Sequence, residues 1–245
     1  MSEFNEFDQQ GSVPRKDTGN IISHAFEMYK GVFLYAMIAM IVYIIGGGIL
    51  QAISGFNSTS FIEEVQSSSR NITSVRYWDM PGFSLYSSLS GLLTLLLTPL
   101  YVGLIYIINK YNTKNTIEFS DLFIGYKQNF LNILIYSLIS GFISGITFGM
   151  CFLPFIFVFP FLLLGYPILL FENATAIEAL GKSFSIAKEN YGTFLGVSLL
   201  GLLISFCGVF LCGIGIIATA PFIMAVMYST YCAYCGKPRQ IIFKG

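Results

Sequence analysis

Four long runs of this 245-residue chain contain no Asp, Glu, Lys, Arg or His. They extend over residues 31–62, 85–109, 131–171 and 193–231. About 20 apolar residues cross the hydrocarbon core of a bilayer as a helix, so these runs have room for six helices. A large soluble core is the alternative, but 11% charged residues are too few to cover the surface of a soluble domain. The sequence therefore predicts an all-α, polytopic membrane protein.

We expect six transmembrane helices joined by two short turns and by longer polar connections. Their approximate ranges are residues 32–54, 84–109, 130–150, 153–172, 193–213 and 215–234. Residues 1–20 are polar and are expected to form a disordered cytoplasmic tail. Residues 21–235 are expected to form a single transmembrane domain with an outward loop at about 55–83, followed by a cytoplasmic tail at 236–245.

The basic residues are distributed unevenly between the two sides that these spans define. Eleven Lys and Arg residues lie on the side of the termini, whereas Arg70 and Arg76 lie on the opposite side. Cytoplasmic segments of membrane proteins carry the excess of basic residues. We therefore expect both termini in the cytoplasm of a bacterial cell and the protein in its inner membrane. The formal net charge of zero argues against nucleic acid as a partner.

A short motif, Phe-x-x-(Tyr/Ala)-Lys-x-x-(Phe/Tyr), occurs three times, each time directly before a predicted span. The residues of its three copies are Phe26, Lys30 and Phe33; Phe123, Lys127 and Phe130; and Phe184, Lys188 and Tyr191. We interpret each copy as a structural elbow between a cytoplasmic amphipathic helix and the span that follows. Such a helix lies in the membrane interface with its lysine toward the headgroups.

Three prolines support a threefold internal repeat. Pro99, Pro160 and Pro221 follow one another at intervals of 61 residues. Lys127 and Lys188 each precede a proline by 33 residues, whereas Lys30 precedes Pro99 by 69. The pattern predicts three parallel helical-hairpin units, at about residues 21–110, 115–172 and 175–235, with an insertion in the first.

Each proline is expected to kink its helix. It frees the carbonyl four residues earlier, which belongs to Leu95, Ile156 or Ile217. Two interpretations remain open: the kinks converge on a central pathway, or they are ordinary packing bends. The glycines within the spans are expected to allow close contact between helices.

Two local signals mark helix starts. Thr175 and Glu178 have the spacing of a capping box, which would begin the third amphipathic helix. Asn129 and Asn190 each precede a span and are expected to cap it.

The sequence lacks the residues that ion coupling, catalysis or metal binding in a membrane protein would require. The predicted spans hold no charged residue, which argues against an ion-coupled transporter. His24 is the only histidine, and we interpret it as an interfacial polar residue rather than a catalyst. Cys232 and Cys235 form a CxxC motif, but no second pair completes a zinc site. We therefore expect no catalytic residues, no cofactor and no metal.

The segment around the third motif resembles a group of uncharacterised six-span bacterial membrane proteins. These are related to the membrane domain of some glycerophosphodiester phosphodiesterases. The residues that carry the resemblance are Glu172, Glu178, Ala179, Leu180, Ser183, Lys188, Tyr191 and Pro221. The resemblance covers about residues 115–235 and implies topology rather than an activity.

The sequence supports two functional hypotheses. The first is a non-enzymatic scaffold or accessory subunit that contacts membrane lipids and a protein partner in the membrane. The second is a binder or transporter of a lipid or small apolar molecule that uses the proline-kinked helices.

Overall fold

The charge-free runs fold as helices. The computed structural model describes residues 11–59, 80–150, 153–210 and 215–238. All the regular secondary structure in these ranges is helical. The elements are α1 (Thr18–Ser54), α3 (Phe83–Asn112), η4 (Phe119–Phe123), α4 (Ile124–Lys127), α5 (Phe130–Gly149), α6 (Leu153–Leu162), α7 (Gly165–Glu172), α8 (Ala176–Glu189), α9 (Tyr191–Cys207), η5 (Gly208–Phe210), α10 (Gly215–Thr219) and α11 (Phe222–Cys235).

Six helical stretches within the described residues are long and apolar enough to cross a membrane. They are Thr18–Ser54, Phe83–Asn112, Phe130–Gly149, Leu153–Glu172, Tyr191–Phe210 and Gly215–Cys235. The predicted all-α class and the six apolar spans are therefore confirmed. The predicted outward loop lies mostly outside the described residues, because it falls largely in 60–79.

The first amphipathic segment and the first span are one uninterrupted helix. Helix α1 runs through Lys30 without a break, so the elbow predicted at Phe26, Lys30 and Phe33 does not form. The buried residues Ala25, Tyr29, Val32, Ala36 and Ala39 follow one another at steps of four and three. This continuous buried face favours one uninterrupted helix, and no Pro or Asn lies near Lys30 to end it.

The other two motifs do lie at helix boundaries. Helix α4 ends at Lys127 and α5 begins at Phe130, with Asn129 in the left-handed conformation at φ 51°. Helix α8 ends at Glu189 and α9 begins at Tyr191. The chain therefore changes helix at both positions, and the intervening residues include an asparagine each time.

The expected helix caps are only partly observed. The capping box at Thr175 is confirmed, because Glu178 N donates to Thr175 Oγ1 and Thr175 N donates to Glu178 Oε2 at 2.9 Å. Asn129 and Asn190 occupy N-cap positions, but neither side chain caps its helix. Asn129 Nδ2 instead donates to the carbonyls of Leu169 and Ala174, at 3.0 and 2.7 Å. Its amide thus ties the start of one span to the end of the next.

The three prolines occupy different places in their helices. Pro99 lies within α3, which continues to Asn112. Pro160 lies near the end of α6, and a two-residue turn separates α6 from α7. Pro221 is the N-cap of α11, two residues after the end of α10. The second and third prolines therefore coincide with a helix interruption, and the first does not.

The chain divides into two compact units. One consists of residues 40–97, and the other of residues 1–39 and 98–245. Within the smaller unit, Phe56 is buried against Phe83 and Tyr86. Gly82 has φ +74°, and a Cβ there would overlap the carbonyl of Ser54, so this turn requires glycine.

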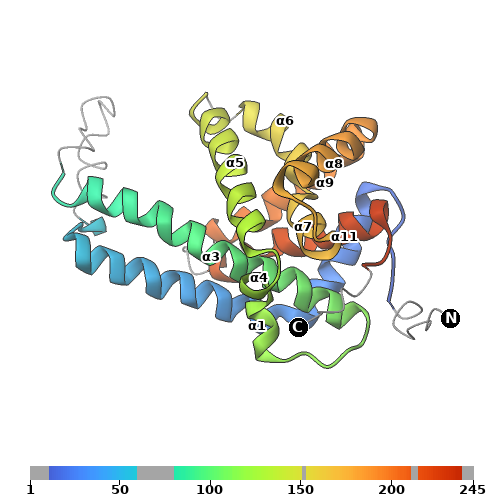
Figure 1. Cartoon of the computed structure of the whole chain (residues 1–245), viewed down its shortest axis with the longest axis horizontal. Coiled ribbons are helices and arrows are strands. Elements are labelled where there is room, and N and C mark those ends of the chain that lie inside the picture. The colour runs from blue at the N-terminus through green and yellow to red at the C-terminus, as the bar shows by residue number, and fades with distance from the viewer. Residues whose placement is uncertain (1–10, 60–79, 151–152, 211–214, 239–245) are drawn as a thin grey trace. The chain divides into compact units, whose positions relative to one another are not determined.

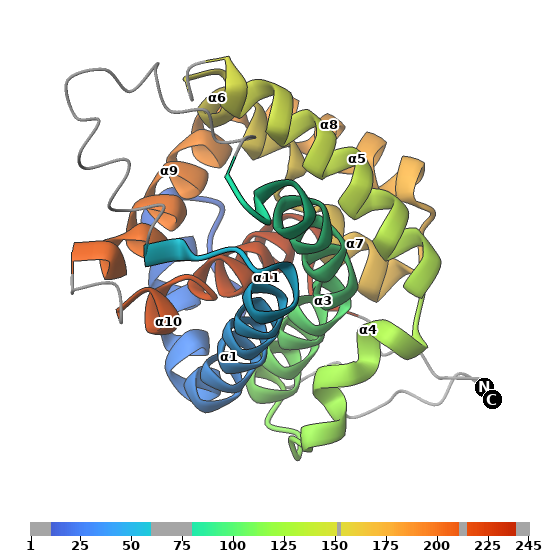
Figure 2. The ribbon, with the colours of Figure 1, turned by 90° about the vertical axis from the view of Figure 1, so that its left-hand side faces the viewer.

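The larger unit holds most of the core. Helix α5 packs against α6 and α8, and α9 packs against α6 and α11, as the two views show (Figure 1; Figure 2). Leu163, Ile168 and Tyr228 are fully buried there.

Candidate functional site

The proline interruption between α6 and α7 is held by side chains from two neighbouring helices. Ser183 of α8 donates through Oγ to the carbonyl of Phe161 at 2.6 Å and accepts from the amide of Leu164 at 3.2 Å. Tyr136 of α5 donates to the carbonyl of Leu162 at 2.8 Å. The last carbonyls of a helix have no partner within it, and these hydroxyls supply donors. The interruption is therefore a fixed part of the fold.

Aromatic rings cover the same place. Phe184 stacks on Phe161 with ring centroids 4.8 Å apart, and Tyr191 stacks on Phe161 at 5.4 Å. The Tyr191 hydroxyl donates to the carbonyl of Phe157 at 3.2 Å. Two residues of the third motif thus pack on the helix that contains Pro160.

The interruption between α10 and α11 is held by α1 in a similar manner. The Tyr29 hydroxyl donates to the carbonyl of Ala218 at 2.7 Å, in the last turn of α10. Phe26 and Tyr29 both contact the ring of Phe222, at centroid distances of 4.6 and 5.5 Å. In both interruptions a tyrosine hydroxyl donates to the carbonyl three residues before the proline, which belongs to Phe157 or Ala218. The carbonyl that we expected each proline to free lies one residue earlier in the chain.

The segment η4–α4 packs closely on α3 around Pro99. A Cβ on Gly103 would overlap the backbone of Leu122, and a Cβ on Gly125 would overlap the backbone of Pro99. Glycine is therefore required at both positions for the backbones to approach.

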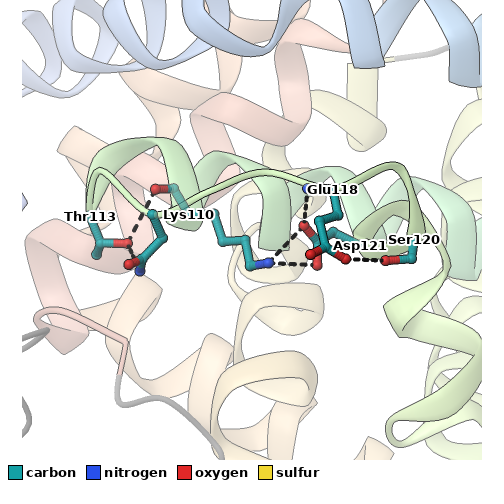
Figure 3. A network of polar contacts seen from close by, with 6 residues as sticks. Lys110, Thr113, Glu118, Ser120 and Asp121 are labelled. Atoms are coloured by element: carbon teal, nitrogen blue, oxygen red, sulfur yellow. Dashed lines mark hydrogen bonds and ion pairs between the residues drawn. The ribbon is translucent and has the colours of Figure 1, made fainter.

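An ion pair completes this contact (Figure 3). Lys110 Nζ donates to both carboxylate oxygens of Asp121 at 2.8 Å. The amide of Glu118 donates to Asp121 Oδ2 at 2.7 Å. The two charged side chains are only 18% and 10% exposed. Asp121 therefore neutralises Lys110 and also starts the η4 turn.

His24 lies in a polar cluster that joins α1, α3 and α11. The expectation of an interfacial position is wrong, because His24 is only 6% exposed. Its Nε2 lies 2.9 Å from Ser12 Oγ and its Nδ1 lies 2.9 Å from Ser229 Oγ. His24 belongs to the buried face of α1 between Ile21 and Met28, and sequence position alone did not show which partners it meets there.

Further hydrogen bonds connect Ser12 to α3 and α3 to α11. Ser12 N donates to Asn112 Oδ1 at 2.8 Å, and Asn112 Nδ2 donates to the hydroxyl of Tyr228 at 2.8 Å. That hydroxyl donates to Asn109 Oδ1 at 3.0 Å. Ser12 Oγ also donates to Asn112 Oδ1 at 3.0 Å.

His24 is therefore held between two serine hydroxyls, one at each nitrogen of its ring. The cluster thus ties Ser12, which lies in the segment predicted as a disordered tail, to three helices. The first ten residues of that tail lie outside the described residues.

Other candidates for chemistry have no supporting arrangement. Cys207, Cys232 and Cys235 are free thiols, and the remaining two cysteines lie outside the described residues. Within the described ranges, no group of three or more His, Cys, Asp or Glu residues could hold a metal ion. At the end of α7, Glu172 accepts from Lys182 at 2.6 Å and from the Tyr231 hydroxyl at 3.1 Å.

The motif lysines are exposed at the surface. Lys30, Lys127 and Lys188 are all exposed, and no ion pair to another described residue involves them. The phenylalanine four residues before each lysine is also partly exposed, by 39% at Phe26 and 48% at Phe184. Of the other motif residues, Phe33 is 42% exposed, and Phe130 and Tyr191 are intermediate.

The glycines of the spans fall into two groups. A Cβ on Gly165 would overlap the ring of Tyr136, and one on Gly208 would overlap the backbone of Gly215. In contrast, a Cβ on Gly141, Gly145 or Gly149 of α5 would have no atom within 4 Å among the described residues. The expectation of close helix contact holds for the first group and fails within this chain for the second.

Comparison of the chain with protein-family models, curated proteins and solved structures found no match.

Proposed function

We propose that this chain is a non-enzymatic integral membrane protein that serves as a scaffold or accessory subunit of a membrane complex. The six apolar helical stretches support insertion in a membrane. The excess of basic residues on one side supports cytoplasmic termini, and the resemblance to bacterial six-span proteins supports the inner membrane.

The proposal includes three parallel units that close on one another. Three polar contacts support it. Each joins the residue that precedes a motif lysine by six positions to the last span of another unit. They are His24 with Ser229, Asp121 with Lys110, and Lys182 with Glu172. In this arrangement each amphipathic segment holds the proline-containing span of the unit before it, and the first segment holds that of the third.

The open glycine face of α5 carries the scaffold proposal. Gly141, Gly145 and Gly149 recur every four residues and so lie along one side of the helix. Glycines at this spacing let the backbone of a second transmembrane helix approach closely. Phe142 and Phe148 beside them are 71% and 58% exposed, which would add packing area to such a contact.

The test is a photo-crosslinking amino acid placed on α5 in living cells. At Gly145 it should capture a membrane protein. At Leu131, which is 67% exposed but lies at the start of α5, it should capture less. Affinity purification in mild detergent should then recover the same protein with wild-type chain and lose it with Gly145→Leu. Equal capture at both positions, with nothing retained on purification, would argue against a scaffold.

A second candidate function is binding of a lipid or small apolar molecule between the interrupted helices. Two buried hydroxyls of α9 favour it, because Ser198 and Ser205 have no hydrogen-bond partner among the described residues. The carbonyls of Phe161, Leu162 and Ala218 argue against it, since serine or tyrosine hydroxyls already occupy them. If the scaffold proposal is correct, native mass spectrometry should find no bound molecule whose retention Ser198→Ala changes. A stoichiometric apolar ligand that Ser198→Ala weakens would favour the second function.

A further inference from the structure

The three motif lysines hold matched positions relative to the contacts between the units. Six residues before each lysine stands the side chain that bonds to another unit: His24, Asp121 or Lys182. Four residues before each lysine stands a partly exposed phenylalanine: Phe26, Phe123 or Phe184. Two of these phenylalanines contact the residue that directly follows a proline, namely Phe222 and Phe161. The three lysines therefore hold matched positions relative to these contacts, although Lys30 lies inside α1 whereas Lys127 and Lys188 lie at the ends of α4 and α8.

The lysines of the larger unit differ in how their charge is neutralised. Lys110 and Lys182 lie in ion pairs with Asp121 and Glu172. Lys30, Lys127 and Lys188 are exposed and have no acidic partner within 4.0 Å among the described residues. Exposed Glu27 and Glu189 are the nearest acids in sequence to Lys30 and Lys188, and neither forms an ion pair with them. Three charges at equivalent positions thus remain available to a ligand outside the protein.

Phe26 and Lys30 lie four residues apart in α1, and Phe184 and Lys188 lie four apart in α8, so each pair lies on the same side of its helix. Phe123 and Lys127 are the last residues of η4 and α4. In a membrane interface the ring enters the boundary of the acyl chains, and the ammonium group extends toward the phosphates. The rings of Phe26, Phe123 and Phe184 are half-exposed and so are free to enter the boundary of the acyl chains. The ligand that matches both groups has a phosphate beside an acyl chain and carries a net negative charge.

We propose that Lys30, Lys127 and Lys188 form three equivalent contacts for the headgroup of an anionic phospholipid. This inference depends on the proposed placement of these residues at the cytoplasmic surface. Basic side chains next to an anionic membrane surface each contribute about 1 kcal/mol, or about fivefold in affinity. Loss of all three should therefore remove most of the preference for anionic over zwitterionic lipid.

The experiment uses full-length protein in nanodiscs that contain phosphatidylcholine with or without phosphatidylglycerol. Native mass spectrometry after mild delipidation should show up to three retained phosphatidylglycerol molecules on the wild type. The Lys30→Gln, Lys127→Gln, Lys188→Gln triple variant should retain them about fivefold less per site. The corresponding triple arginine variant keeps the charge and should retain them like the wild type. Lys114→Gln removes an exposed lysine outside the motif and should have no effect.

Two results would overturn the inference. One is equal retention of phosphatidylglycerol by the wild type and the triple glutamine variant, with helical content unchanged in both. The other is equal retention of the anionic and zwitterionic lipids by the wild type. Either result leaves the scaffold proposal intact if crosslinking at Gly145 still captures a partner. Conversely, a chain that sodium carbonate extracts from membranes would contradict the scaffold proposal itself.

Discussion

Replacement of Asp121 by alanine should destabilise the larger unit by about 2–3 kcal/mol. The variant removes an acceptor of two hydrogen bonds from Lys110 and one from the amide of Glu118. Breaking a buried ion pair costs about 3–5 kcal/mol, and an exposed pair contributes about 0–1. Because Lys110 keeps 18% exposure and can recover some hydration, we expect a value between the exposed and the buried ranges.

The assay is thermal unfolding of purified protein in mild detergent, followed by circular dichroism. A loss of about 2–3 kcal/mol corresponds to a decrease in Tm of about 4–12 °C for a chain of this size. The Lys110→Met, Asp121→Leu double variant removes both charges and should recover most of the loss. Lys182→Ala breaks the more exposed pair with Glu172 and should lower the stability by less than about 1 kcal/mol. A Tm for Asp121→Ala within 1 °C of the wild type would refute the reasoning.

Three further predictions concern single side chains. Gly165→Ala should destabilise the protein by about 1–3 kcal/mol because the added Cβ overlaps the Tyr136 ring. Gly141→Ala should be neutral or stabilising, because no atom lies within 4 Å of its Cβ. Equal Tm values for the two variants would contradict this. Tyr29→Phe should cost about 1–3 kcal/mol because the carbonyl of Ala218 loses its donor, and Tyr111→Phe, which alters a 40% exposed residue, should change Tm little. The hydrogen bond from the Thr175 amide holds the pKa of Glu178 below its usual value of 4.5. The capping box should therefore stabilise α8 at pH 7 and lose this effect as the pH falls through the lowered pKa, so the decrease in Tm caused by Glu178→Ala should shrink as the pH falls below 4.5.

The sequence predicts the spans well because each depends only on local composition. A run of uncharged residues longer than a bilayer is thick has few ways to fold other than as a helix in a membrane. The capping box at Thr175 is equally local, since both partners lie within one turn. The continuity of α1 depends instead on a face that is buried along its first half, which a short motif at Lys30 does not reveal.

The contacts between helices could not be predicted, because they join residues far apart in the chain. His24 and Ser229 are 205 positions apart, and neither belongs to a motif. Asn109, Asn112 and Tyr228 lie within helices that are long and apolar enough to cross a membrane, where the surrounding apolar residues dominate the pattern. The same limit applies to glycines: Gly165 and Gly145 have similar neighbours in sequence, but only the first meets another side chain.

The closure of the first unit on the third is tested most directly by a disulfide between Thr18 and Gly196. A Cβ built on Gly196 lies 3.6 Å from the Cβ of Thr18, within the range of natural disulfides. In a variant that lacks the native cysteines, Thr18→Cys with Gly196→Cys should oxidise rapidly in membranes, and mass spectrometry should detect the linked peptides. Thr18→Cys with Leu199→Cys, where Leu199 is 40% exposed nearly one turn further along α9, should link far less. Absence of the first disulfide, or equal linkage in both variants, would contradict the closed arrangement of the three units.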